Sequence, residues 1–296
     1  MNRTFLNSLL VFIAGASYGL IVPVIKGAGE IGIFPSTFLP LQYLVAFLAC
    51  LAVMLIRRMR WGSPKRLLPL ALLGFCTGGT SICYYSAVTL LPSSAALTLL
   101  FQYIWISVLI ECLHKKALPA RSTIIAIVVV LIGTLFATGL LDGNMSTLNP
   151  IGVLFGFGSG ICYALFLYYS GIIGAGQPTI LRTAMLALGG LIFTSIMSPS
   201  AFTVSLPDPS TWPYAVGLAI LGILFPVSLI NFASPKLTTG MVSIMASSEL
   251  PVGILAAWAL VGDVPSPLVL FGALLVLVGI VIKQVPELKR RTPLEK

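Results

Sequence analysis

The chain has 296 residues, of which 58% are hydrophobic and only 8% are charged. A soluble domain carries about 25% charged residues, so this composition excludes a soluble globular protein and indicates a protein of the membrane. The net charge of +9 does not indicate a nucleic-acid partner, because the basic residues are spread over separate segments and are not gathered on one face.

Ten apolar runs of about twenty residues follow one another along the chain. Each is long enough to cross a bilayer as a helix, in which the backbone satisfies its own hydrogen bonds. We therefore predict an all-α membrane protein with ten transmembrane helices. In chain order the predicted spans lie near residues 5–25, 36–56, 67–88, 93–112, 121–140, 150–170, 180–198, 212–231, 240–261 and 267–284.

The basic residues predict the orientation of these spans. With a cytoplasmic N-terminus, all of the 17 Lys and Arg residues except Lys26 lie in or next to cytoplasmic segments. Since positive charge gathers on the cytoplasmic side, we expect both termini in the cytoplasm and the protein in a bacterial-type inner (plasma) membrane. The alternative is a signal peptide cleaved near Ala14-Gly15-Ala16, but the apolar run continues beyond that point to Ile25.

The chain resembles itself at a fixed spacing. Residues 14–20 match residues 159–165 at an offset of 145, and Gly133 matches Gly279 at an offset of 146. Such matches in the same order along the chain predict an internal repeat.

The repeat divides the chain into two predicted five-helix halves, residues 1–148 and 149–296. Because five is odd, the second half crosses the membrane in the opposite sense to the first. Inverted repeats are a common construction of secondary transporters, which hold their substrate near the bilayer midplane between the repeats.

Both halves carry a pattern known from one family. It consists of Ser93-Ser94-Ala95-Ala96, Ser248-Glu249-Leu250-Pro251-Val252, Val261-Gly262-Asp263, Gly272 and Gly279. With these residues nearly the whole chain resembles the EamA-type transporters of the drug/metabolite transporter superfamily. The resemblance implies a central cavity between the repeats and proton-coupled or facilitated movement of small metabolites, often the export of amino acids. The family often has Gly-Glu where this chain has Gly262-Asp263, and we interpret Asp263 as a polar helix end.

Glu249 is an acidic residue in the interior of a predicted span. It lies nine residues from Gly240, about 13 Å along a helix and therefore near the midplane. A charge there costs at least about 2.5–3.5 kcal/mol, so the side chain is expected to face protein or water and to pair or stay protonated. Glu249 is therefore a candidate for substrate binding and proton coupling, and a permanently protonated structural carboxyl is the alternative.

Pro251 predicts a break in the same helix. Proline has no backbone N–H and its ring displaces the carbonyl four residues earlier, that of Ser247. We expect this freed carbonyl to lie beside Glu249.

Further polar and aromatic residues are candidates for a substrate site. Gln102, Tyr103 and Trp105 are the 146-residue counterparts of Ser248, Glu249 and Pro251. Taken singly, each aromatic residue is equally compatible with packing or lipid contact. Taken as a set they would bind a flat or apolar solute. The full set of substrate-binding candidates is Tyr18, Tyr84, Tyr85, Gln102, Tyr103, Trp105, Tyr163, Asn231, Ser248 and Glu249.

The sequence therefore predicts a secondary transporter for small organic solutes, most simply an exporter of amino acids or related compounds. The expected partners are a small-molecule substrate, the lipid bilayer and protons as coupling ion, with the protein a monomer or a homodimer. The alternatives are a multidrug exporter of the same superfamily, a non-transporting membrane protein and an intramembrane enzyme. The single histidine and five dispersed cysteines predict no catalytic set, no metal site and no cofactor.

Overall fold

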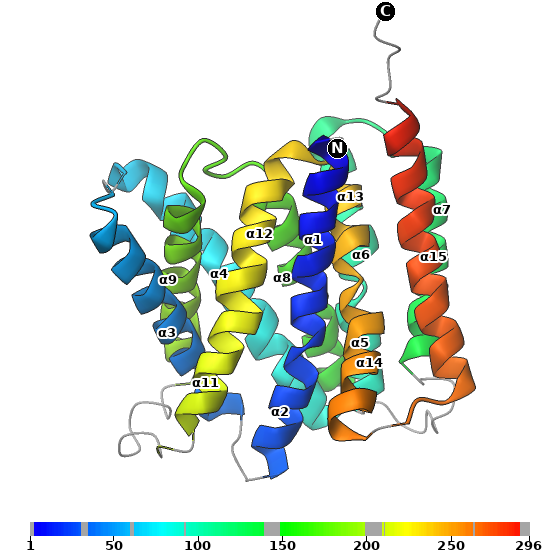
Figure 1. The fold of residues 1–296 in the computed structure, drawn as a ribbon, viewed down its shortest axis with the longest axis horizontal. Helices are drawn as coiled ribbons and strands as arrows, with labels where there is room; N and C mark the ends of the chain where they lie inside the picture. Colours follow the sequence, from blue (N-terminus) through cyan, green and yellow to red (C-terminus); the bar gives the residue numbers. More distant parts are fainter. Residues whose placement is uncertain are drawn as a thin grey trace, which may run out of the picture.

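The computed structural model describes residues 3–30, 35–59, 62–91, 93–138, 149–198, 209, 211–262 and 264–290. Within these ranges every regular element is a helix (Figure 1). Asp263, interpreted above as a polar helix end, lies outside the described residues. The predicted junction between residues 148 and 149 adjoins a stretch that is also outside them, and it stays a prediction.

The first half of the chain supplies five membrane-crossing segments. They are α1 (Arg3–Gly19) continued by α2 (Ile21–Glu30), then α3 (Pro35–Ile56), α4 (Pro64–Leu90), α5 (Ser93–Leu100) continued by α6 (Tyr103–Lys115), and α7 (Arg121–Ala137). The second half repeats this order. Its segments are α8 (Pro150–Ser170), α9 (Thr179–Met197), α11 (Thr211–Ala219) with η2 (Ile220–Leu224), α12 (Phe225–Ala233) and η3 (Ser234–Lys236), then α13 (Thr239–Ala246) with α14 (Glu249–Val261), and α15 (Pro267–Arg290).

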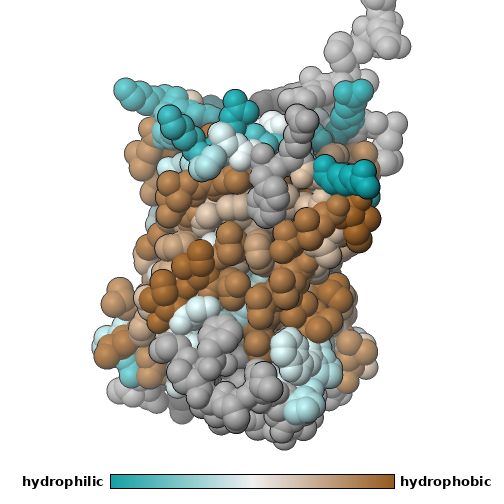
Figure 2. All heavy atoms as spheres, turned by 90° about the vertical axis from the view of Figure 1, so that its left-hand side faces the viewer, coloured by the Kyte–Doolittle hydropathy of each residue, from teal (hydrophilic) through white to brown (hydrophobic). Residues whose placement is uncertain are grey.

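These elements confirm the predicted all-α membrane fold of ten segments. In the described part of the chain, nine segments have the length and composition to cross a membrane, and α7 is a shorter apolar helix of 17 residues. The face at which α1 begins and α15 ends is called the terminal face below, and the other is the distal face (Figure 1). A belt of apolar side chains separates the two faces (Figure 2), and lipid-facing residues such as Leu55, Ile56 and Leu154 are at least 64% exposed.

The two halves are interleaved. The first segment of each half packs against the third and fourth segments of the other, with α1 on α12, α13 and α14, and α8 on α4, α5 and α6. Glycines allow this close approach. A Cβ atom on Gly160 would lie 2.9 Å from the Leu99 carbonyl oxygen, and one on Gly156 would lie 2.9 Å from the Leu99 Cβ.

Two helix breaks occupy equivalent places in the two halves. One separates α5 from α6 at Phe101 and Gln102, and the other separates α13 from α14 at Ser247 and Ser248. The offset between the breaks is 146 residues, the spacing at which the sequence resembles itself. The breaks therefore confirm that Tyr103 and Glu249 are counterparts, each the first residue of the helix that follows.

The predicted free carbonyl of Ser247 is wrong. That carbonyl accepts a hydrogen bond of 3.2 Å from the Leu250 amide, because the chain tightens to a shorter turn at the break. Pro251 lies in the first turn of α14, where a missing N–H costs no intrahelical hydrogen bond. The break precedes the proline by three residues.

Candidate functional site

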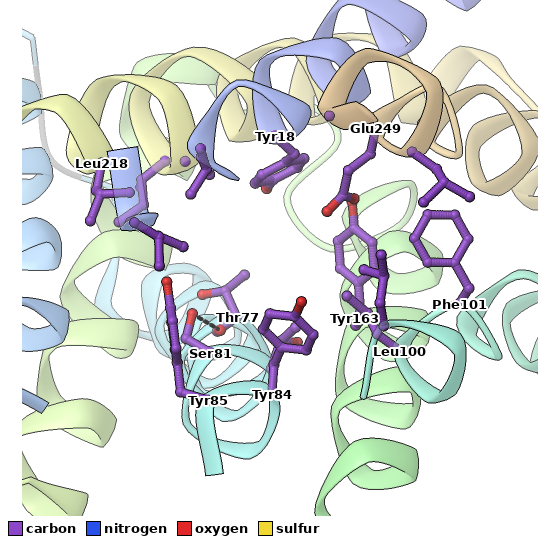
Figure 3. Close-up of a pocket in the computed structure, with 18 of the residues that line it drawn as sticks. Tyr18, Thr77, Ser81, Tyr84, Tyr85, Leu100, Phe101, Tyr163, Leu218 and Glu249 are labelled. Atoms are coloured by element: carbon purple, nitrogen blue, oxygen red, sulfur yellow. Dashed lines mark hydrogen bonds between the residues drawn. The ribbon is translucent and has the colours of Figure 1, made fainter. Parts of the chain in front are cut away.

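A cavity of about 400 Å³ lies between the two halves, in the distal part of the bundle. Its walls come from α1 to α5, the end of α7, and α8, α11, η2, α12 and α14. Figure 3 shows Tyr18 and Glu249 on one wall, with Thr77, Ser81, Tyr84 and Tyr85 of α4 on the opposite wall. Both halves therefore contribute to a single site.

Tyr18 and Tyr163 form the centre of the cavity wall. They are counterparts at the 145-residue offset, and their rings contact each other edge to face with centroids 6.1 Å apart. Two equivalent residues that touch must lie beside the axis that relates the repeats. The cavity is therefore next to the pseudo-twofold axis, where transporters of inverted repeats hold their substrate.

Glu249 is the first residue of α14, and its side chain points into the cavity beside Tyr163 (Figure 3). Its side chain is partly exposed. Within the described residues no basic side chain forms an ion pair with it. The N-terminus of α14 carries a partial positive charge that favours an anion, so the helix break itself supplies the electrostatic support that a salt bridge would give elsewhere.

The wall opposite Glu249 carries hydroxyl groups from α3 and α4. The Tyr43 and Ser81 hydroxyls are 3.3 Å apart, and Ser81 donates to the Thr77 carbonyl at 3.3 Å. Sequence reasoning named Tyr84 and Tyr85 but missed Gln42, Tyr43 and the threonines and serine of α4. A signal was present, because Thr77, Thr80, Ser81 and Tyr84 recur every three or four residues and place one polar stripe on an otherwise apolar helix.

Five of the ten substrate-binding candidates line the cavity, namely Tyr18, Tyr84, Tyr85, Tyr163 and Glu249. The structure does not bring the other five to its wall, namely Gln102, Tyr103, Trp105, Asn231 and Ser248. Gln102 accepts a hydrogen bond of 2.8 Å from the Trp105 indole and donates to the Thr98 carbonyl. The Ser248 hydroxyl donates to the Phe12 carbonyl at 2.7 Å and thereby ties the second helix break to α1.

Tyr103 belongs to a packed contact between α6 and α13 on the terminal side of the cavity. Its hydroxyl donates to the Ser243 carbonyl at 3.4 Å, and the hydroxyls of Ser107 and Ser243 are 2.5 Å apart. All three side chains are fully buried. This contact, called the terminal gate below, packs against the cavity residues Phe101 and Tyr163 through the ring of Tyr103.

Asn231 and Arg182 lie together at the terminal ends of three helices. Arg182 was expected in a cytoplasmic segment, but it is 1% exposed in the first turn of α9. Its guanidinium donates to the carbonyls of Ser170 and Asn231. Ser170 is the last residue of α8 and Asn231 lies in the last turn of α12, so the cation binds the negative ends of two helix dipoles. Asn231 also donates to the Thr183 hydroxyl at 3.3 Å, so it serves this cluster and not the cavity.

The residues that the structure describes contain no group of three or more His, Cys, Asp or Glu side chains able to hold a metal ion. The polar groups in the cavity wall include the hydroxyls of its tyrosines, threonines and serine and the carboxyl of Glu249.

Comparison with known proteins supports the repeat. The EamA-like transporter family matches the chain twice, over residues 6–139 and 150–283. A solved structure, titled only as the crystal structure of a protein, superposes with a TM-score of 0.80 over 96% of this chain and 99% of that one. Its sequence identity is 16%, so this likeness shows the fold alone. No curated protein matches the chain.

Proposed function

The chain belongs to the EamA-like transporter family, and we propose that it is a secondary transporter that moves a small organic solute through this cavity by alternating access. The observation that carries the proposal is the position of Glu249. An acidic side chain faces a cavity beside the axis of two inverted repeats, and a packed gate closes one side of that cavity. Because the family consists of transporters, the prediction that the chain is not an enzyme is confirmed.

The size and lining of the cavity support amino acids or related metabolites as substrates. A volume of about 400 Å³ lies at the lower end of ordinary ligand pockets. Aromatic rings offer faces for an apolar or flat side chain, while the hydroxyls of α3 and α4 and the Glu249 carboxyl offer hydrogen bonds to a polar backbone. A solute with one polar end and one apolar end suits this division.

The proposed location of the protein is an inner (plasma) membrane, with both termini in the cytoplasm. The described basic residues Arg57, Lys65, Arg66, Lys115 and Arg121 lie at helix ends on the terminal face, which supports a cytoplasmic position for that face. A cysteine introduced at Lys65 then reacts with an impermeant maleimide only in inverted membrane vesicles. Reaction in intact, right-side-out vesicles would show that the protein has the opposite orientation, with the terminal face outside.

Export and proton coupling are part of the proposal. With the terminal face in the cytoplasm, the gate seen here separates the cavity from the cytoplasm, which suits a state that has released its solute outward. Glu249 is the group that would exchange a proton for the solute.

Transport itself is tested by counterflow in proteoliposomes loaded with single amino acids, including threonine, methionine and the aromatic ones, with and without an imposed pH gradient. We expect saturable exchange of at least one of them and acceleration by the gradient. If no member of a broad metabolite panel exchanges under either condition, the proposed function is wrong.

The aromatic and apolar lining also favours a second candidate, a multidrug exporter of the same superfamily. Overexpression in a drug-sensitive strain separates the two. Resistance to several unrelated apolar drugs, together with an absence of amino-acid counterflow, would select the second candidate.

A further inference from the structure

The terminal gate and the inverted repeat together specify what closes the other side of the cavity. The gate is a contact between the helix that follows the first break and the helix that precedes the second. Tyr103 and Ser107 of α6 meet Ser243 of α13 there. Since the repeats are related by a twofold axis, exchanging their conformations replaces this contact by its counterpart on the distal side.

The counterpart is found by applying the 146-residue offset that the two helix breaks share. It replaces Tyr103 by Glu249, Ser107 by Gly253 and Ser243 by Leu97. All three of these residues line the cavity in the present structure. They are therefore the walls that must come together when the distal side closes.

The exchanged contact is sterically plausible. The terminal gate pairs two serines, whereas the distal contact pairs a glycine with a leucine. The large leucine side chain can therefore pack against the backbone of the glycine, which has no side chain. Glu249 is shorter than Tyr103, and Gly253 lets α14 approach α5 closely enough to make up the difference. Gly253 already lies against α1, because a Cβ atom on Gly19 would be 2.7 Å from its amide nitrogen.

The chemistry of the contact differs between the two sides. In the terminal gate the Tyr103 hydroxyl donates a hydrogen bond to the Ser243 carbonyl, and a tyrosine can do so at any physiological pH. In the distal contact the donor must be Glu249 and the acceptor the Leu97 carbonyl. A carboxyl group donates only when it is protonated, and a carboxylate facing a carbonyl oxygen is repelled by it.

We infer that Glu249 is the closing residue of a distal gate, in which its neutral carboxyl donates to the Leu97 carbonyl while Gly253 packs against Leu97. Deprotonation of Glu249 opens this gate, and protonation permits it to close. The inference rests on the proposed alternating access, and it adds the physical step that links one proton to the change of conformation.

The groups that face Glu249 do not replace it in this role. The described titratable side chains around it are the phenols of Tyr18 on α1, Tyr84 on α4, Tyr103 on α6 and Tyr163 on α8. No described basic or acidic side chain of α7 or α15, which also pack against α14, reaches it. Among these described groups Glu249 is the carboxyl, and it is the one that donates a hydrogen bond only when it is protonated.

The test is disulfide cross-linking without substrate in a variant whose five cysteines have been replaced. The pair Leu97→Cys with Gly253→Cys reports the distal gate, and the matched pair Ser107→Cys with Ser243→Cys reports the terminal gate. As the pH rises we expect the distal cross-link to decrease and the terminal cross-link to increase. Because one proton is linked, the ratio of the two changes by up to about tenfold per pH unit.

Two substitutions in matched positions identify the donor. With Glu249→Gln, whose amide always donates and never ionises, the distal cross-link forms at every pH. With Tyr103→Phe the terminal gate loses its donor, so the distal cross-link increases while its pH dependence remains. A distal cross-link that is absent at every pH, or that keeps its pH dependence in Glu249→Gln, overturns the inference.

A second measurement avoids the substitution of Gly253. Labelling of Ser81→Cys, on the cavity wall, by an impermeant maleimide from the distal side should decrease as the pH falls, and in Glu249→Gln this pH dependence of the gate should be lost. Labelling independent of pH in the protein with native Glu249 contradicts the inference. If these conformational changes occur but no solute exchanges, the distal gate stands and the proposed function fails. If solute exchanges but these conformational changes do not occur, the proposed function stands and the distal gate is overturned.

Discussion

Glu249 combines three features of its position. It faces the cavity, it begins a helix whose dipole favours an anion, and it lacks an ion-pair partner among the described residues. A carboxyl in such a place can change its protonation state at a smaller cost than one that is held in a salt bridge. The residue therefore suits a proton carrier better than a permanent structural acid.

Substitution Glu249→Gln is expected to separate exchange from coupling. Gln keeps the volume and a hydrogen-bond donor, so counterflow should stay within about threefold of the unmodified protein. Accumulation driven by a pH gradient should fall by more than about tenfold, because no proton is carried. Uptake of labelled substrate with and without the gradient measures both, and accumulation that survives unchanged places the coupling group elsewhere.

Arg182 is expected to matter for stability more than for transport. Substitution Arg182→Ala leaves the carbonyls of Ser170 and Asn231 without their charged donor, which should cost about 2–3 kcal/mol and lower Tm by about 5–10 °C. Thermal denaturation in detergent tests this, with Arg121→Ala at an exposed position as the control. Equal Tm values for the two variants would contradict the assigned role.

At the scale of elements, the broken helices form the site. The breaks before Tyr103 and Glu249 place one polar side chain of each half near the axis, and α1 and α8 hold those breaks through glycine contacts. A Cβ atom on Gly15 would meet the Ala246 carbonyl and the Ser248 hydroxyl at the second break. The contact of α1 with this break is thus a place where small residues are required.

Substitution Gly15→Ala should therefore push α1 away from the second break. Overpacking of this kind costs about 1–3 kcal/mol, and it should reduce counterflow because the cavity wall carrying Glu249 moves. Gly176→Ala is the matched control, since a Cβ atom there has no neighbour within 4 Å. Counterflow and Tm unchanged in both variants would show that the close approach of α1 is not needed.

The sequence predicted the elements better than it predicted the site. Runs of apolar residues revealed every segment, because lipid imposes the same length and composition on each of them. The offset between Tyr103 and Glu249 was also correct. The sequence did not reveal that Tyr103 belongs to the terminal gate and not to the cavity wall. Symmetry gives two counterparts the same surroundings only when both halves have the same conformation. Asn231 lies away from the cavity because it belongs to the cluster around Arg182, which the sequence placed in a cytoplasmic segment.

At the scale of the whole molecule, the two halves are alike in sequence order but differ in their contacts. The terminal side is closed by α6 against α13, while the distal side contains the cavity. If the two halves had identical conformations, the contacts on the terminal side would equal those on the distal side. The difference between the faces is what alternating access requires of one of its two states.

The most direct test of alternating access is to lock the terminal gate. A disulfide between Ser107→Cys and Ser243→Cys, in a variant without the native cysteines, holds α6 against α13 at a place where the native hydroxyls are 2.5 Å apart. We predict that the oxidised variant loses counterflow and that a reductant restores it to the level of the unoxidised protein. Counterflow that continues at the full rate while the disulfide is intact would contradict the account, because the solute would then cross without opening this gate.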